Sequence, residues 1–145
     1  MKKIPVPDAR VMTKGSSLTE TTEQELLKKL KKFEESNKFI NPKLSLSLLA
    51  THLGTNTNYL SEVINTNKGK NYNNYINEVR IDYICSKILN DSLYRKYKVS
   101  YLAEKCGFTS YSSFTTVFKN INGISPSIFI KQVEQSIKEN ATKHG

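Results

Sequence analysis

The chain of 145 residues is long enough for one helical domain with a short tail, and such a core needs no disulfide or metal to stabilise it. Its 22 Lys and Arg against 13 Asp and Glu give a formal charge of +9, which favours a polyanionic partner, nucleic acid before an anionic membrane surface, with a merely soluble surface as the alternative. No apolar run approaches the roughly 20 residues of a membrane span and no signal peptide follows Met1, so we expect no membrane insertion and a cytoplasmic location.

The first part of the chain predicts a lead-in followed by one helix. Residues 1–21 contain two prolines and a glycine without hydrophobic periodicity, which is typical of a linker or a disordered segment. Thr22 and Glu25 then form a capping-box pattern at the start of a helix that is expected to end near Asn37. Its predicted apolar face comprises Leu26, Leu27, Leu30 and Phe33. Its Lys28, Lys29, Lys31 and Lys32 are interpreted as a solvated face, with some phosphate contact as the alternative.

A helix pair is predicted next. Asn41 and Pro42 interrupt the helical pattern before a new apolar run begins at Leu46. Gly54 then marks a tight turn, and a second amphipathic run follows it. The residues of this second run that point inward are Leu60, Val63 and Ile64.

The stretch from Tyr72 to about Asn90 has apolar residues at helical spacing, and Asn71 is its candidate N-cap. It predicts one linker helix of about 28 Å, which could hold the units on either side as a fixed pair. We interpret Arg80 in this helix as a structural residue that pairs with a nearby acid or carbonyl, and a phosphate contact is the alternative. Residues 91–98 are expected to form a polar loop.

The span from Val99 to Phe129 predicts two short helices, a turn at Gly107 and the start of a third helix. Apolar residues recur at helical spacing on both sides of that turn, while hydroxyl side chains crowd the first two turns of the second helix. A helix-turn-helix has this layout, and its second helix enters the DNA major groove N-terminus first. The inward positions of the two helices are Val99, Leu102, Ala103 and Cys106, then Phe114, Val117, Phe118 and Ile121.

The two helix pairs are copies of one unit. The segment 46–50 aligns with 99–103 and Gly54 aligns with Gly107, an offset of 53 residues (107 − 54). One extra residue in the second copy changes the offset to 54, at which Leu60 aligns with Phe114. Helical scaffolding as in a solenoid is the alternative, but two copies with this turn chemistry favour a pair of DNA-reading units.

The second copy fixes many residue types at set spacings, namely Ala103, Gly107, Phe108, Phe114, Phe118, Lys119, Gly123, Ser125, Pro126 and Phe129. In identity and spacing these residues resemble the C-terminal signature of the AraC/XylS family of bacterial transcription regulators. The resemblance implies a DNA-binding domain, which family members usually join to a ligand-binding or signal-receiving region. The chain departs from the family pattern at Ser113, Thr116 and Ile130, where an aromatic and two basic residues are frequent.

Side chains near the N-terminus of each reading helix are predicted to contact base edges, and flanking polar groups to contact phosphates. An ordinary solvated surface or an N-cap is the alternative for each, above all for Asn56, Ser110 and Ser112. Neither reading helix carries an Arg, so readout should lean toward A·T pairs and thymine methyls. The base-reading candidates are Asn56, Thr57, Asn58, Ser61, Glu62, Tyr111, Ser112, Ser113, Thr115 and Thr116, and the phosphate candidates are Lys68, Lys70, Asn71, Lys119 and Ser125.

The sequence therefore predicts an all-α fold of about seven helices, in which two helix-turn-helix subdomains of homeodomain-like, AraC type are joined by a long linker helix. The expected layout is a lead-in (1–21), a DNA-binding domain (22–139) and a tail (140–145). Within the domain we expect a first unit (about 22–70), a linker helix (about 71–90) and a second unit (about 98–139).

The predicted function is sequence-specific transcription regulation through double-stranded DNA, with RNA polymerase or a sensory domain outside this chain as a further partner. A basic helical protein-interaction module without DNA specificity is the alternative. His52 and His144 are isolated, and Cys85 and Cys106 occupy apolar helical positions, so we expect reduced thiols and no metal or cofactor. Catalysis is not expected, because the sequence lacks paired catalytic residues and a glycine-rich phosphate loop.

Overall fold

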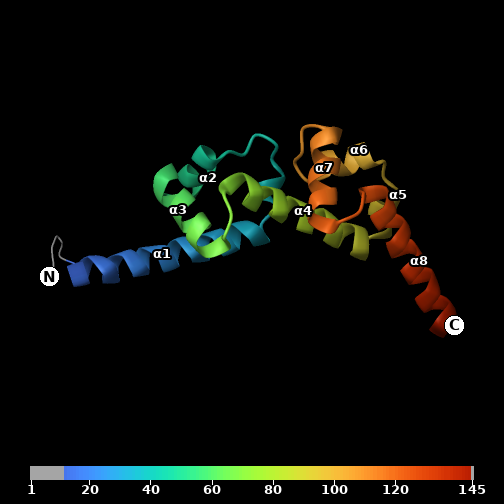
Figure 1. Cartoon of the computed structure of the whole chain (residues 1–145), viewed down its shortest axis with the longest axis horizontal. Coiled ribbons are helices and arrows are strands. Elements are labelled where there is room, and N and C mark those ends of the chain that lie inside the picture. The colour runs from blue at the N-terminus through green and yellow to red at the C-terminus, as the bar shows by residue number, and fades with distance from the viewer. Residues whose placement is uncertain (1–11, 145) are drawn as a thin grey trace. The chain divides into compact units, whose positions relative to one another are not determined.

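The computed structural model describes the backbone of residues 12–144 and the side chains of residues 22–142. Every regular element in that range is helical (Figure 1), which confirms the all-α prediction, with eight α-helices against the seven or so expected. The described residues divide into two compact units: unit 1 comprises residues 12–36 and 45–70, and unit 2 comprises residues 37–44 and 71–144. None of the described helices is both long enough and apolar enough to span a membrane.

Unit 1 is a three-helix arrangement of α1 (Met12–Glu35), α2 (Leu46–Leu53) and α3 (Thr57–Lys68). Each helix contacts the other two. Leu30 and Leu60 are fully buried between them, and complete burial of a leucine side chain contributes about 1.5–3 kcal/mol. The buried apolar side chains of the unit are Leu26, Leu30, Phe33, Leu49, Ala50, Leu53, Leu60, Val63 and Ile64.

Helix α1 begins earlier than the capping-box pattern indicated. The lead-in expected to lack regular structure is helical from Met12 on, while residues 1–11 lie outside the described residues. No proline interrupts the chain between Met12 and Glu35, so the helix continues through Thr22 instead of starting there. The interpretation of its lysines as a solvated face is incomplete, because Lys29 Nζ donates a hydrogen bond of 3.1 Å to the carbonyl of Leu53 at the end of α2.

Unit 2 is built around α4. This helix contacts η1, α5, α7 and α8, and α6 and α8 also pack against α7. Its bounds agree with the sequence prediction, and Asn71 caps it as expected, with Oδ1 accepting a hydrogen bond of 2.9 Å from Asn74 N. The elements are η1 (Lys38–Ile40), α4 (Tyr72–Asn90), α5 (Ser92–Lys96), α6 (Val99–Lys105), α7 (Tyr111–Asn122) and α8 (Pro126–His144).

Aromatic rings dominate the core of unit 2. Phe114 lies 5.4 Å from Phe108 and 5.7 Å from Phe118, centroid to centroid, and Phe118 lies 5.4 Å from Phe129. Such pairs add about 0.5–1.5 kcal/mol each beyond area burial. The prediction of Ile121 as a fourth anchor of α7 is wrong, because its side chain is 40% exposed in the last turn, past the core cluster.

Two helix boundaries of unit 2 also differ from prediction. The expected loop after α4 contains the short helix α5, which begins where Asp91 Oδ1 accepts a hydrogen bond of 3.0 Å from Leu93 N. Helix α8 runs to His144, beyond the expected end near Glu139. The sequence has no Gly or Pro between Pro126 and Gly145 that would end the helix earlier. Gly145 lies outside the described residues.

Both cysteines of unit 2 are free thiols, Cys106 buried and Cys85 half-buried. Burial raises the pKa of the Cys106 thiol to about 12 and that of Cys85 to about 11. Since only the thiolate is a good nucleophile or metal ligand, both side chains act as apolar core groups at neutral pH.

Candidate nucleic-acid interface

The two predicted turns have the same backbone geometry. Gly54 follows α2 at φ 73°, and Gly107 follows α6 at φ 98°. In each case the residue after the glycine donates a hydrogen bond back to the helix, Thr55 N to Ala50 O at 2.9 Å and Phe108 N to Ala103 O at 3.0 Å. This Schellman-type ending satisfies the last carbonyls and turns the chain toward the reading helix.

The predicted reading helices, α3 and α7, are equally long, and their bounds are displaced by 54 residues (111 − 57 and 122 − 68). Each is capped by a polar side chain: Asn56 Oδ1 accepts from Tyr59 N at 2.8 Å, and Ser110 Oγ accepts from Ser113 N at 3.0 Å. Each also ends at a glycine of positive φ. The one-residue insertion of the second copy therefore lies in the turn, and α3 and α7 correspond position by position.

Helix α3 buries one side and presents the other. Leu60, Val63 and Ile64 are buried as predicted, while Asn58 and Glu62 are exposed on the opposite side. Of the remaining reading candidates of this helix, Asn56 is exposed and caps the helix, and Thr57 and Ser61 are half-buried.

The first two turns of α7 present hydroxyl groups and one ring. The Tyr111 side chain is 56% exposed, and Ser112, Ser113 and Thr116 are exposed beside it. Thr115 differs from them, because it is half-buried and its hydroxyl donates a hydrogen bond of 3.1 Å to Ser112 O.

The phosphate candidates fall into two groups. Asn71 and Ser125 are the N-caps of α4 and α8, with Ser125 Oγ accepting from Ile128 N at 3.3 Å, so each lies where a helix N-terminus attracts anions. Among the lysines, Lys119 is exposed and Lys70 is half-buried. Lys68 is engaged within unit 1, its Nζ lying 3.2 Å from Glu34 Oε2.

Arg80 is the one charged side chain among the buried residues that the structure describes, 8% exposed. Its Nε donates to Phe39 O at 2.7 Å and its Nη2 to Asn41 O at 2.8 Å, which confirms the interpretation of Arg80 as a structural residue. Burial lowers the pKa of this guanidinium from its ordinary value. The two carbonyls tie the segment before α2 to the middle of α4.

A hollow of about 440 Å³ lies beside the first two turns of α7, and sequence reasoning missed part of its lining. Ser112, Ser113 and Thr116 were predicted to face outward, whereas Asn77 of α4 was not singled out. No local signal marks Asn77, because it reaches the hollow only through the packing of α4 against α7.

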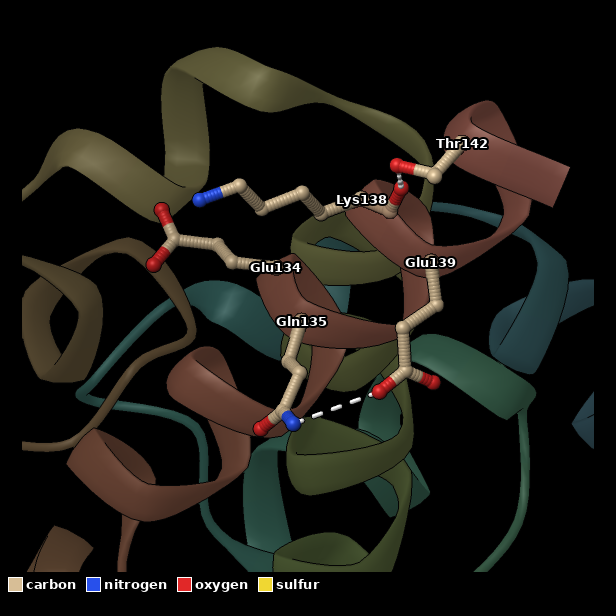
Figure 2. A pocket seen from close by; sticks show the side chains of 5 residues that line it. All are labelled: Glu134, Gln135, Lys138, Glu139 and Thr142. Atoms are coloured by element: carbon tan, nitrogen blue, oxygen red, sulfur yellow. Dashed lines mark hydrogen bonds between the residues drawn. The ribbon is translucent and has the colours of Figure 1, made fainter. Parts of the chain in front are cut away.

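Another hollow, of about 810 Å³, lies beside α8 (Figure 2). Figure 2 shows Gln135 donating to Glu139, at 3.2 Å, and the hydroxyl of Thr142 donating to the carbonyl of Lys138, at 3.0 Å. The lining of this second hollow includes the carboxylates of Glu134 and Glu139 and the ammonium group of Lys138, so the hollow does not favour an anion such as phosphate.

Comparison with known proteins gives the family. A family model described as a helix-turn-helix domain matches residues 49–132, well over half of the chain. No curated protein matches the chain significantly.

Several solved structures share the fold. The C-terminal domain of AraT, a response regulator from Geobacillus stearothermophilus, is 21% identical, with a TM-score of 0.58 over 79% of this chain and 84% of that one. An AraC-type transcriptional regulator from Chromobacterium violaceum is 18% identical, with a TM-score of 0.64 over 79% and 96%. A Listeria innocua protein of unknown function is 25% identical, with a TM-score of 0.60 over 72% and 93%. With the duplicated helix pairs, these findings show that the chain belongs to the AraC-type helix-turn-helix family of DNA-binding transcription regulators.

Proposed function

We propose that one copy of this chain recognises a two-part DNA site, with α3 reading one major groove and α7 reading the next. The observation that carries the proposal is the correspondence of α3 and α7, each capped, anchored by buried apolar residues and polar over its first two turns. A helix of this kind presents its N-terminal side chains to base edges.

The chemistry of the exposed side chains suggests what each helix would read. Asn58 can bond adenine through N6 and N7, Glu62 can accept from the cytosine amine, and the Tyr111 ring offers an apolar surface to a thymine methyl. Without an Arg on either helix, guanine lacks its usual bidentate partner. The proposed base-reading set is the one predicted from sequence, Asn56, Thr57, Asn58, Ser61 and Glu62 in α3 and Tyr111, Ser112, Ser113, Thr115 and Thr116 in α7.

Phosphate attraction supplies much of the affinity in this proposal. Lys70, Lys119 and the caps Asn71 and Ser125 are the proposed contacts, and Lys68 would first have to leave Glu34. Because each neutralised phosphate releases counterions, binding should weaken steeply with salt.

The same proposal assigns no catalytic step to the chain, which acts in the cytoplasm, where bacterial DNA is found. Its further partner is RNA polymerase or a sensory domain. We place the DNA-binding domain within residues 22–139.

The test separates base reading from phosphate attraction. Asn58→Ala should lose about 1–3 kcal/mol on a selected site while leaving random DNA nearly unaffected, since it removes one base contact. Lys70→Ala should weaken both DNAs alike and make the salt slope shallower by about one. Titrations of both duplexes at two salt concentrations measure these effects.

Asn65→Ala is the matched control, because Asn65 is exposed on α3 two turns farther from the N-terminus. It should bind both DNAs like the parent protein. Equal losses on both DNAs for Asn58→Ala would remove that residue from the reading set. A chain that showed no preference among duplexes would instead support a basic helical interaction module.

A further inference from the structure

The hollow beside α7 combines polar groups from two helices of unit 2. Asn77 and Arg80 reach it from α4, and Ser112, Ser113 and Thr116 reach it from α7. Its volume of about 440 Å³ is in the range of sites that hold small ligands.

The guanidinium of Arg80 is the charged group of this lining. Nε and Nη2 donate to backbone carbonyls, and within the described part of the chain Nη1 has no hydrogen-bond partner. The guanidinium carbon lies 6.0 Å from the centre of the Phe108 ring, which also lines the hollow. The cation is therefore held in place with one of its nitrogens still able to donate.

The remaining lining adds donors and no negative charge. No Asp or Glu is among the described residues that surround the hollow. The Asn77 amide and the hydroxyls of Ser112, Ser113 and Thr116 can all donate hydrogen bonds. The backbone N–H of Ser112, in the first turn of α7, also has no intrahelical acceptor. Pro42, Phe108 and Val117 complete the lining with apolar surface. A fixed cation beside several neutral donors is an arrangement that favours an oxyanion.

We propose that this hollow is an oxyanion site, which holds a phosphate group between Arg80 and the hydroxyls of α7. The group belongs either to a small free ligand or to the DNA backbone. Three of the lining residues, Ser112, Ser113 and Thr116, are also proposed base readers, so this coupling to DNA rests on the proposed function. A free ligand would compete with DNA, whereas a backbone phosphate would fix the register of α7 on its groove.

The first experiment uses the protein without DNA, so its result does not depend on the proposed function. Inorganic phosphate is titrated at constant ionic strength against chloride, while NMR follows the amide signals of Ser112 and Ser113. For a free ligand, the shifts should saturate, and Thr116→Val should weaken the binding at least threefold, since it removes one donor and keeps the side-chain shape. Thr142→Val is the matched control and should change nothing, because Thr142 lies on α8, outside this hollow and outside the proposed base-reading set.

The second experiment uses duplexes that carry one neutral methylphosphonate at successive positions. If the site holds a backbone phosphate, free phosphate should not saturate the protein. A methylphosphonate at one position of the duplex should then weaken DNA binding by the parent protein at least threefold, and the same duplex should not weaken DNA binding by Thr116→Val. Linear shifts with free phosphate together with no sensitive position would overturn the proposal. Equal effects of Thr142→Val and Thr116→Val would overturn it as well. Arg80 is left unsubstituted in both experiments, because it holds two carbonyls of the fold.

Discussion

At the scale of single residues, Gly107 is constrained both by its own backbone and by its neighbours. Its φ of 98° lies in the left-handed region, and a Cβ built there would lie 2.8 Å from Arg80 Nε and 2.9 Å from Ile40 O. Gly123 also has a positive φ, of 82°, but a Cβ there would meet nothing within 4 Å. A side chain at Gly123 would therefore meet backbone strain alone, whereas a side chain at Gly107 would meet both backbone strain and steric crowding.

This difference predicts unequal costs for the same substitution. Gly123→Ala should destabilise the protein by about 1–2 kcal/mol through backbone strain alone. Gly107→Ala should cost about 1–3 kcal/mol more, because the new methyl group displaces Arg80 or the backbone at Ile40. Urea unfolding of both variants measures the difference, and equal midpoints would show that Arg80 and the backbone at Ile40 both move aside without cost.

At the scale of elements, α7 is organised by which of its apolar residues are covered. Phe118 is fully buried between Phe114 and Phe129, whereas Ile121, three residues later, is 40% exposed. Both were expected to anchor the helix, since both fit the same helical period. The core cluster covers the middle of α7 and leaves its last turn uncovered.

Truncation of the two side chains should therefore differ in effect. Phe118→Ala should cost about 3–5 kcal/mol and unfold much of unit 2, because it leaves a cavity between the rings of Phe114 and Phe129. Ile121→Ala should change the stability by less than about 1 kcal/mol, as an exposed position does. Thermal melts followed by circular dichroism compare them. An unchanged melting temperature for Phe118→Ala would mean that α7 faces the other way.

At the scale of the whole molecule, the chain carries two unlike copies of one helix pair, each with a proposed reading helix. Asn58, at the start of α3, corresponds to Ser112 in α7, and Glu62 corresponds to Thr116. One monomer should therefore recognise an asymmetric site of two unlike halves, about 10 base pairs apart, and palindromy is not required.

Changing the spacing between the halves tests this model. Insertion of about five base pairs turns one half-site to the opposite face of the duplex, so one unit should lose its contacts. Footprinting should then show a single protected half and weaker binding. Insertion of about ten base pairs serves as the control, because it returns the second half-site to the same face of the duplex but leaves the two half-sites farther apart. Undiminished binding with both halves protected after the five-base-pair insertion would exclude a two-part site.

The sequence by itself determined the local features of this protein. The cap Asn71 and the turn glycines Gly54 and Gly107 were readable, and a cap was the alternative for Asn56, because each acts through hydrogen bonds and backbone angles within about four residues. The 54-residue repeat and the family resemblance come from the same short-range signals. Where those signals were weak, at the start of α1 and in α5, the prediction was wrong.

Only the tertiary structure decided which residues meet across the chain. Arg80 bonds the carbonyl of Phe39, 41 positions away, and the period of α4 does not reveal that partner. The exposure of Ile121 and the hollow lined by Asn77 likewise depend on where one helix ends against another. Periodicity reports which face of a helix is apolar, but burial depends on which neighbours cover that face, and how far along the helix they extend.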